Sequence, residues 1–394
     1  MPKTKLLHLL FLALLSALPP LSIDMGLPSL PAMSVSFGVS ASAAAFTITF
    51  FMAGFALSPV IYGTLSDRWG RRPLLIAGLV LFAFGGIACL WAPNLNWLLA
   101  ARFLQGLGAG CGPTLAFAIT RDRLSGRALG QRLALLTMLL NSAPIVAPGL
   151  GTFWLFLGGW RGSYIILAIG GVLLLLAACV SFDETREAND GQQGGVFTEF
   201  LQDAVSLWRR PDILLPGLIY GLSAGAMFAY VSTSSLLFMQ GLGASAGLYA
   251  GLFAMTGTAA CLGAYVSGRA LRKSTPLTLT MVGQSLMVFG PVCALLVFAG
   301  HTHVVVLAIG CMIITMFGYG LIAPASAHAT LEPLPSVAGT ASALMNGGQM
   351  SCMAFSSLLA SLLFHLCGGF GPPVMILAFA LTSSVCLYQW RVRR

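Results

Sequence analysis

The sequence predicts an all-α polytopic membrane protein in which twelve transmembrane helices form two pseudo-symmetric six-helix halves around a central cavity. Three observations carry this prediction. Of the 394 residues, 57% are hydrophobic and 8% are charged, whereas about a quarter of a soluble domain is charged. Long apolar stretches separate clusters of basic residues, and one charged segment divides the stretches into six and six. Because one helical crossing takes about 20 residues, twelve crossings with their loops leave no room for a soluble domain.

The apolar stretches give the predicted spans in chain order. Their approximate limits are 6–30, 42–64, 73–92, 96–119, 129–153, 161–182, 212–236, 245–267, 276–299, 304–328, 337–366 and 371–390. Residues 183–211, rich in charge and glycine, form a predicted solvated linker between an N-terminal half, 1–182, and a C-terminal half, 212–394. Within the linker, Val196–Trp208 has the pattern of an amphipathic helix on the membrane surface. We expect the first span to be an uncleaved helix and not a signal peptide, because no small-x-small site precedes Asp24.

The basic residues predict the orientation of the chain. Eighteen of the 20 Lys and Arg lie in six clusters between apolar stretches. Twelve spans that begin in the cytoplasm would place all six clusters on the cytoplasmic side, as the positive-inside rule requires. We therefore expect both termini and the linker to be cytoplasmic. The net charge of +9 then reflects topology, which excludes a nucleic-acid partner. The composition also excludes a soluble enzyme and a receptor with a large ectodomain.

The two predicted halves share a pattern. Ser66–Arg72 and Ser267–Lys273 both read Ser-x-Arg-x-x-Arg-basic, each after the second span of its half. We interpret this as duplication, although any cytoplasmic loop at this place needs positive charge. Two six-helix halves around a cavity are a transporter architecture. The nine cysteines show no metal-ligand spacing, and the glycine-rich stretches lack the P-loop pattern, so we expect no metal and no cofactor.

Two charged residues lie inside predicted spans and away from the ends of those spans. Asp24 is the one acid outside the predicted cytoplasmic segments, and it lies about 28 Å of helix beyond Lys5. Arg102 lies about 8 Å inside a span that enters from the other side, so both residues belong to the periplasmic half. Charge at membrane depth usually serves function, and we predict that the pair couples protons to transport. The competing interpretations are an interfacial acid facing water and an arginine that snorkels to the interface.

The loop between the second and third predicted spans has an ordered pattern of glycine, acid and arginine. Glycine permits a tight turn. An acid in this loop can bind the N-terminus of the eleventh predicted span, which carries a partial positive charge, and Arg121 is its second candidate partner. A purely topological loop would need only its arginines. We predict a conformational switch made of Gly63, Asp67, Arg68, Gly70, Arg71, Arg72 and Arg121.

The loop resembles the signature of the major facilitator superfamily, G-x-L-x-D-R-x-G-R-[RK], at every defined position, and the resemblance covers the whole chain. It is similar above all to the Bcr/CflA group of bacterial drug:proton antiporters. The segments that carry this likeness are Asp24–Pro31, Arg102–Gly110, Trp160-Arg161 and Ala338–Leu344. The resemblance implies an acid at Asp24 and proton transfer through the Arg-x-x-Gln-Gly segment.

The fifth predicted span is similar to the antiporter motif of that group. The residues concerned are Pro144, Pro148, Gly149 and Gly151. Prolines inside a helix remove backbone donors and kink or stiffen it. The span departs from the wider motif at Ala143, where glycine is usual, and Gly26 stands where the group often has tyrosine, which changes the shape of the cavity.

These features predict a monomeric, proton-coupled efflux transporter. It would export small, mostly apolar or weakly polar drugs and other xenobiotics across the bacterial inner membrane by alternating access, driven by the proton gradient. The candidate substrate-binding residues are Phe46, Phe50, Gln105, Asn141 and Tyr230. One alternative is a transporter of the same fold that is specific for one metabolite, such as a nucleoside or a sugar. A membrane enzyme or sensor would need a catalytic cluster or a soluble appendage, and the sequence offers neither.

Overall fold

The computed structural model describes residues 3–124, 126–182, 184–185, 206–207, 210–299, 305–333 and 338–393, and every regular element in these ranges is a helix. In chain order the elements are α1 (Lys3–Asp24), η1 (Leu27–Ser29), α2 (Leu30–Phe37), α3 (Ala41–Trp69), α4 (Arg71–Leu90), α5 (Leu95–Ala109), α6 (Cys111–Arg123), α7 (Gly126–Gly158), α8 (Arg161–Ser181), α10 (Pro211–Ser235), η2 (Leu236–Gly241), α11 (Ala246–Ala270), α12 (Pro276–Ala299), α13 (Val305–Leu331), α14 (Ala338–Cys367), η3 (Gly368–Phe370) and α15 (Gly371–Val392). The predicted helix Val196–Trp208 lies, apart from two residues, outside the described part.

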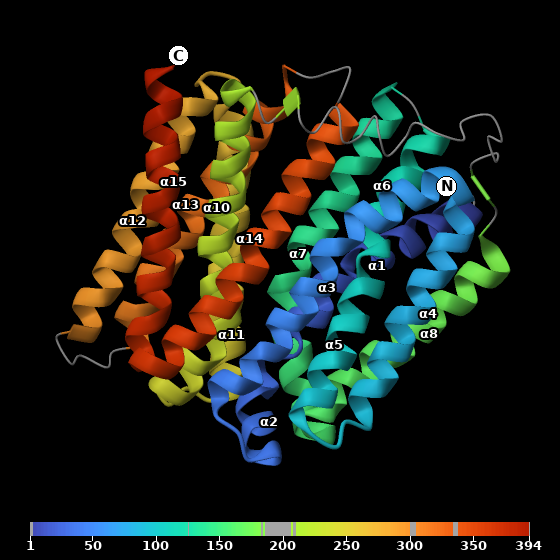
Figure 1. Ribbon diagram of the computed structural model, residues 1–394, viewed down its shortest axis with the longest axis horizontal. Coiled ribbons are helices and arrows are strands. Elements are labelled where there is room, and N and C mark those ends of the chain that lie inside the picture. The colour runs from blue at the N-terminus through green and yellow to red at the C-terminus, as the bar shows by residue number, and fades with distance from the viewer. Residues whose placement is uncertain are drawn as a thin grey trace. The chain divides into compact units, whose positions relative to one another are not determined.

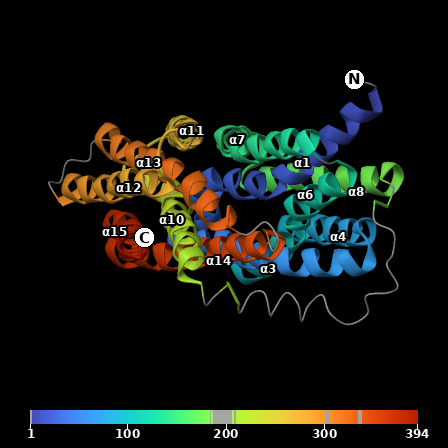
Figure 2. The same ribbon diagram turned by 90° about the horizontal axis from the view of Figure 1, so that it is seen from above.

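The chain forms two compact units. The first comprises Met1–Met33 and Phe50–Val196, and the second comprises Ser34–Thr49 and Phe197–Arg394. In the first unit α4 packs along α8, which both views show (Figures 1 and 2). In the second unit α13 packs against α11 and α12, and α10 packs against α14 and α15. The predicted division at residues 182 and 212 stays a prediction.

Nine helical stretches among the described residues are long and apolar enough to cross a bilayer. One of them, Leu344–Val392, has 49 residues and contains most of α14 and all of α15, whereas one crossing takes about 20 residues. The helices α5 and α6, with 15 and 13 residues, are each shorter than a crossing. An all-helical, multi-pass membrane protein is thus confirmed, and the count of twelve crossings stays a prediction.

Two predicted spans are broken. The first, expected over 6–30, ends as a regular helix at Asp24 and continues through η1 and α2 to Phe37. Pro28 begins this continuation at a position where a helix needs no amide donor. The fourth, expected over 96–119, divides at Gly110 into α5 and α6. Periodicity alone did not show these breaks, because both sides of each break remain apolar.

Glycines set how closely the helices approach. In the first unit, a methyl group at Gly106 of α5 would overlap the backbone of Phe51 on α3. In the second unit, a methyl group at Gly263 of α11 would overlap the carbonyl of Phe317 on α13, and Gly320 faces α11 in the same way. Small residues at such interfaces permit the close backbone packing that holds membrane helices together.

A polar clamp joins two helices of the second unit. The Gln284 amide on α12 donates to the Ala380 carbonyl at 2.6 Å and to the Ser384 hydroxyl at 3.1 Å on α15. Its oxygen accepts a hydrogen bond from the Ser383 hydroxyl at 3.1 Å. Hydrogen bonds between helices stabilise packing in a membrane, where water does not compete for the partners.

Gly263→Ala should destabilise the second unit, because the added methyl group must displace the α13 backbone. We expect the thermal midpoint in detergent to fall by a few degrees. The matched control is Gly251→Ala in the same helix, where a methyl group meets no described atom within 4 Å and should be neutral or slightly stabilising. Equal midpoints for the two variants would contradict the packing argument.

Candidate functional site

Arg102 is buried in the first unit, with 1% of its surface exposed. Its guanidinium donates a 2.7 Å hydrogen bond to the Gln105 side-chain oxygen and a 3.0 Å hydrogen bond to the Ser22 carbonyl. The ring of Phe51 lies 4.3 Å and that of Tyr164 5.5 Å from the guanidinium carbon. Hydrogen bonds and aromatic faces offset the loss of water around a buried cation. The side chain is therefore enclosed by protein and does not snorkel to an interface.

The end of α1 supplies the acceptor for Arg102. In a continuous helix the amide of Gly26 would bond to the carbonyl of Ser22. Here that amide donates to the Ile23 carbonyl at 3.2 Å instead, which releases the Ser22 oxygen. Unsatisfied carbonyls at a helix C-terminus carry partial negative charge, and a cation is favoured there. The break after Asp24 is thus what allows α5 to hold α1 through its arginine.

Asp24 is the last residue of α1 and is also buried, with 3% of its surface exposed. The residue after it is gripped by two more helices. The Ser163 hydroxyl of α8 donates to the Met25 carbonyl at 3.1 Å, and Gly151 of α7 lies so close to the Met25 backbone that a methyl group there would overlap it. Three helices, α5, α7 and α8, therefore converge on the segment that carries Asp24.

The structure links Arg102 to the helix of Asp24 through a backbone carbonyl. The guanidinium donates to the carbonyl of Ser22, and Asp24 lies two residues further along α1. The two predicted coupling residues therefore share one site. A movement of α5 relative to α1 would alter the surroundings of the carboxylate through the shared Ser22–Met25 turn.

Gln105, expected to bind substrate, is first of all the partner of Arg102. It is fully buried, and its side-chain nitrogen has no hydrogen-bond partner among the described residues. That nitrogen lies beside Gly86 of α4, where an added methyl group would come within 3.2 Å of it. A buried donor without an acceptor is costly, so this amide is available to a water molecule or a polar ligand.

The four antiporter-motif residues all lie in α7, and of the two glycines only Gly151 is in close contact with another helix. The helix runs without interruption through Pro144 and Pro148. Gly149 faces open space among the described residues, whereas Gly151 packs on the Met25 backbone. The motif therefore meets the segment of Asp24 through Gly151, a relation that the sequence pattern did not reveal.

The loop before α4 is built around a carboxylate that the sequence analysis missed. Glu184 accepts hydrogen bonds from the amides of Arg71 at 2.9 Å and Arg72 at 3.0 Å. These are the first amides of α4, whose helix dipole favours an anion at this end. Gly70 has φ of +91°, and a side chain there would also collide with the Glu184 carboxylate. Both requirements explain the glycine.

The Arg71 side chain extends the same network. It is buried, donates to the Ser66 hydroxyl at 2.6 Å and pairs with Asp122 at 3.0 Å. The Thr185 hydroxyl donates to the same Asp122 oxygen at 3.2 Å. The loop, the end of α6 and the residues after α8 are thereby tied together. The sequence analysis places Glu184 and Thr185 in the solvated linker. The signal that could have identified them is an acid close behind a predicted span.

The other predicted switch residues are less engaged. Arg72 donates to the Cys179 carbonyl at 2.8 Å, while Arg68 and Arg121 are exposed and Gly63 is half-buried. The side chain of Asp67 lies outside the described residues, so its predicted partners stay a prediction. The same holds for the side chain of Asn141.

The remaining substrate candidates differ in their surroundings. Phe50 is 39% exposed and Phe46 is half-buried. Tyr230 is 1% exposed. Its hydroxyl shares a 3.1 Å hydrogen bond with that of Thr256, and its ring stacks on Phe253. Tyr230 is therefore a packed residue of the second unit in this structure, and a role in substrate binding stays a prediction.

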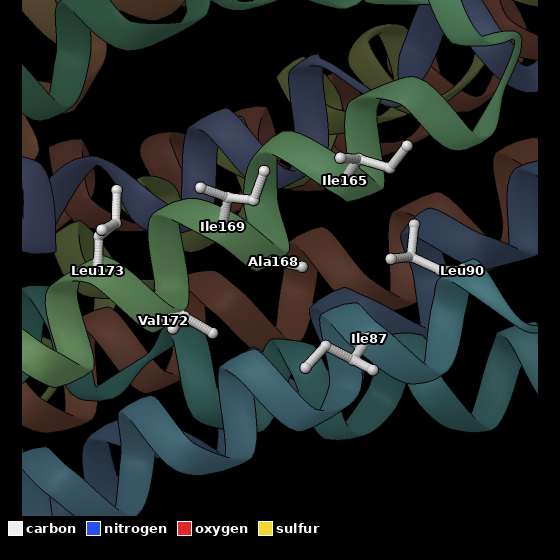
Figure 3. Close-up of a pocket in the computed structure, with 7 residues that line it drawn as sticks. All are labelled: Ile87, Leu90, Ile165, Ala168, Ile169, Val172 and Leu173. Atoms are coloured by element: carbon white, nitrogen blue, oxygen red, sulfur yellow. The ribbon is translucent and has the colours of Figure 1, made fainter.

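The grooves on the first unit are apolar. One, of about 290 Å³, lies between α4 and α8, where Ile87 and Leu90 face the α8 side chains (Figure 3). The α8 residues that line it are Ile165, Ala168, Ile169, Val172 and Leu173. A surface of this kind suits lipid chains. Within the described ranges, no three His, Cys, Asp or Glu side chains gather as a metal site would require.

Comparisons with known proteins agree with this fold. Residues 12–357 match the Major Facilitator Superfamily. The chain is 34% identical over 269 residues to the uncharacterized MFS-type transporter YdgK of Bacillus subtilis, covering 68% of this chain and 67% of that protein. It is 32% identical over 267 residues to the multidrug resistance protein MdtL of Shigella dysenteriae, covering 68% and 67%.

Solved structures resemble the chain over nearly its full length. A bacterial homologue of the human lysosomal transporter Spinster gives a TM-score of 0.78 at 15% identity, covering 99% of this chain and 97% of that one. A D-xylose–proton symporter gives 0.73 at 16% identity, covering 96% of each chain. At these identities the likeness concerns the fold alone.

Glu184→Gln should loosen the start of α4, because a neutral amide retains one acceptor and loses the charge that the helix dipole favours. We expect hydrogen exchange at the amides of Arg71 and Arg72 to become about 3- to 10-fold faster. Peptide-resolved exchange mass spectrometry measures this directly, since the next residue, Pro73, contributes no amide.

The control for this exchange measurement is Glu332→Gln, which changes an exposed carboxylate just after α13. It should leave the α4 amides unchanged. Unaltered exchange at Arg71 and Arg72 in Glu184→Gln would show that the carboxylate does not hold the helix start.

Proposed function

Because this chain belongs to the Major Facilitator Superfamily of membrane transporters, we propose that it is a proton-coupled exporter of small, mostly apolar or weakly polar drugs, of the Bcr/CflA type. The relative named as a multidrug resistance protein supports export of drugs. The single observation that carries the proton coupling is the burial of Asp24 and Arg102 on neighbouring helices of one unit. The protein acts as a monomer in the bacterial inner membrane, with both termini cytoplasmic, and needs no cofactor beyond the proton gradient.

Asp24 is the proton-carrying group in this proposal. A carboxylate anion without water or a partner is costly, and a proton removes that cost. Alternating access supplies the change of surroundings: the acid is hydrated when the site opens and dry when it closes. Arg102 is hydrogen-bonded to the carbonyl of Ser22, two residues before Asp24. When the guanidinium approaches the Asp24 carboxyl it favours the anion, and when it withdraws it favours the protonated acid.

The contacts around Met25 carry the change of charge to the rest of the unit. Gly151 of α7 and Ser163 of α8 touch this residue, which follows Asp24 directly. A shift of the Asp24 segment therefore displaces α7 and α8 together. Packed helix interfaces change between discrete arrangements, so the two helices move as a unit with the segment. Proton binding and helix movement are coupled by this shared contact.

The loop network serves as the conformational switch. The Arg71 ion pair and the Glu184 cap hold α3, α4, α6 and the end of α8 together. Asp67 engages the start of the eleventh predicted span or Arg121 in one state and releases it in the other. Such an exchange of contacts at a helix terminus needs only small movements.

Asp24→Asn should abolish uphill export while the protein stays folded, because the amide cannot carry a proton through the cycle. The measurement begins with a susceptibility screen of cells expressing the protein, which identifies a substrate. Transport of that compound driven by a pH gradient then follows in proteoliposomes. Arg102→Ala should behave like Asp24→Asn, and Arg102→Lys should keep part of the activity because the charge survives without the guanidinium geometry.

The control is Asp212→Asn, an exposed acid paired with Arg210 at the start of α10, which should transport normally. If Asp24→Asn exports uphill with an unchanged pH dependence, the proton site lies elsewhere. A screen that finds one natural solute and no drug would favour the metabolite transporter instead.

Gly151→Ala should impair transport far more than Gly149→Ala. The first methyl group must push the Met25 backbone away, while the second enters open space. Small displacements at a functional site cost much activity, so we expect a loss of about 10-fold or more in initial rate for Gly151→Ala and little change for Gly149→Ala. Equal rates in proteoliposomes, at equal protein content, would refute the coupling of α7 to the Asp24 segment.

A further inference from the structure

A positive charge stands at one end of the first unit where the positive-inside rule does not require it. Arg161 is the first residue of α8, and it belongs to none of the six basic clusters. Twelve spans that begin in the cytoplasm would place it on the periplasmic side, where that rule expects few basic residues. Topology therefore does not explain this arginine, and the proposed export mechanism makes no use of it.

Backbone carbonyls fix the Arg161 side chain at the end of α4. Its Nε atom donates to the Leu90 carbonyl at 3.0 Å, and its Nη2 atom donates to the Ala92 carbonyl at 3.4 Å. The Trp160 ring lies 4.1 Å from the guanidinium carbon. These groups are all neutral, and no carboxylate among the described residues pairs with Arg161. Because the side chain is only half-buried, its positive charge is within reach of an anion from outside the protein.

An apolar groove begins beside this guanidinium. Leu90, whose carbonyl binds Arg161, also lines the groove of about 290 Å³ between α4 and α8. Figure 3 shows Leu90 and Ile87 on one side of the groove and the α8 side chains on the other. Small residues meet at its floor, because a methyl group at Gly86 of α4 would lie 3.4 Å from the Cα atom of Ala168 on α8. Branched side chains on both sides of this floor leave a furrow that opens at the surface.

The groove has the length of one membrane leaflet. Leu173, the lining residue farthest along α8, follows Arg161 by twelve positions, which is about 18 Å of helix. One leaflet supplies half of a hydrocarbon core about 30 Å thick. At the Arg161 end, Trp91 and Trp97 are exposed, and the Trp97 indole donates to the Ala88 carbonyl of α4 at 3.0 Å. Exposed tryptophans are typical of the membrane–water interface, so Arg161 lies at the level of the lipid headgroups.

We propose that Arg161 and the groove between α4 and α8 form a binding site for an anionic phospholipid. The phosphate of the lipid pairs with the Arg161 guanidinium, and one acyl chain lies along the groove toward Leu173. Guanidinium groups bind phosphate through charge-assisted hydrogen bonds, and the Nη1 group of Arg161 is not used by the two carbonyls. The proposal is independent of the export function, because it uses none of the residues assigned to proton coupling.

The charges around Arg161 favour a lipid with a net negative charge. Residues 87–97 and 158–165, which form this end of the groove, contain no acidic residue. A zwitterionic headgroup brings an ammonium group that would find a guanidinium here and no carboxylate in these segments, whereas an anionic headgroup brings only the charge that Arg161 attracts. The apolar lining adds affinity for the chain, which a soluble phosphate compound cannot use.

The test is native mass spectrometry of the purified full-length protein, titrated with phosphatidylglycerol or with phosphatidylcholine of the same acyl chains. The wild type should bind phosphatidylglycerol about 5- to 10-fold more tightly, as expected for one partly exposed charged hydrogen-bond pair. Arg161→Gln should remove this preference and leave the Kd for phosphatidylcholine unchanged. The matched control is Arg269→Gln, which removes an exposed arginine over the Tyr265 ring of α11 and should keep the preference.

A second pair of variants tests the groove itself. Ile169→Trp fills the groove from an exposed position in its lining, and it should weaken the binding of both lipids by about 3-fold or more. Leu176→Trp, an exposed position of the same helix outside the lining, should bind both lipids like the wild type. Glycerol 3-phosphate, which offers the phosphate without the chains, should not displace phosphatidylglycerol.

Arg161→Lys separates recognition of the lipid from a purely structural role in holding the end of α4. This variant loses the carbonyl contacts but keeps the charge, so it should retain part of the preference for phosphatidylglycerol even if its thermal midpoint falls. The proposal is overturned if the wild type binds both lipids equally, or if Arg161→Gln keeps the preference and only lowers the midpoint. Unchanged lipid binding in Ile169→Trp, or full displacement of the lipid by glycerol 3-phosphate, would also overturn it.

Discussion

A charged or polar group inside a membrane must find its partners within the protein, and Arg102 shows how this chain meets that constraint. The guanidinium needs an oxygen acceptor deep in the first unit, and the broken end of α1 supplies the carbonyl of Ser22. The turn that frees this oxygen also carries Asp24. The need of the buried guanidinium for an acceptor thereby brings the only acid of α1 and the only base of α5 into one site.

Close packing couples the Asp24 site to the helices around it. Gly151 and Ser163 press on Met25 from two helices, so the chemistry at Asp24 is not insulated from the helices around it. Tightly packed interfaces respond to small changes by shifting between discrete arrangements and not by gradual deformation. The same property makes glycine contacts such as Gly106 against Phe51 both stabilising and sensitive to a single methyl group.

In the loop before α4, outside the membrane, charged groups are also paired within the protein. Glu184 satisfies the first amides of α4, and Asp122 satisfies the buried Arg71. These acids neutralise a loop that composition alone would describe as a cluster of positive charge. The loop is therefore a structured joint between four segments of the first unit, and its arginines have defined positions in addition to their topological role.

The sequence by itself determined the all-helical membrane class, because apolar stretches of span length separated by basic clusters leave a bilayer as the only solvent that fits. It also identified Asp24 and Arg102, since charge within an apolar stretch stands out without any knowledge of contacts. Only the tertiary structure decided that α1 ends at Asp24, that Arg102 reaches the carbonyl of Ser22, and that Glu184, 113 positions after Arg71 in the chain, caps α4. Hydropathy is assigned residue by residue along the sequence. These contacts join groups that are distant along the chain, so their geometry exists only once the helices have packed.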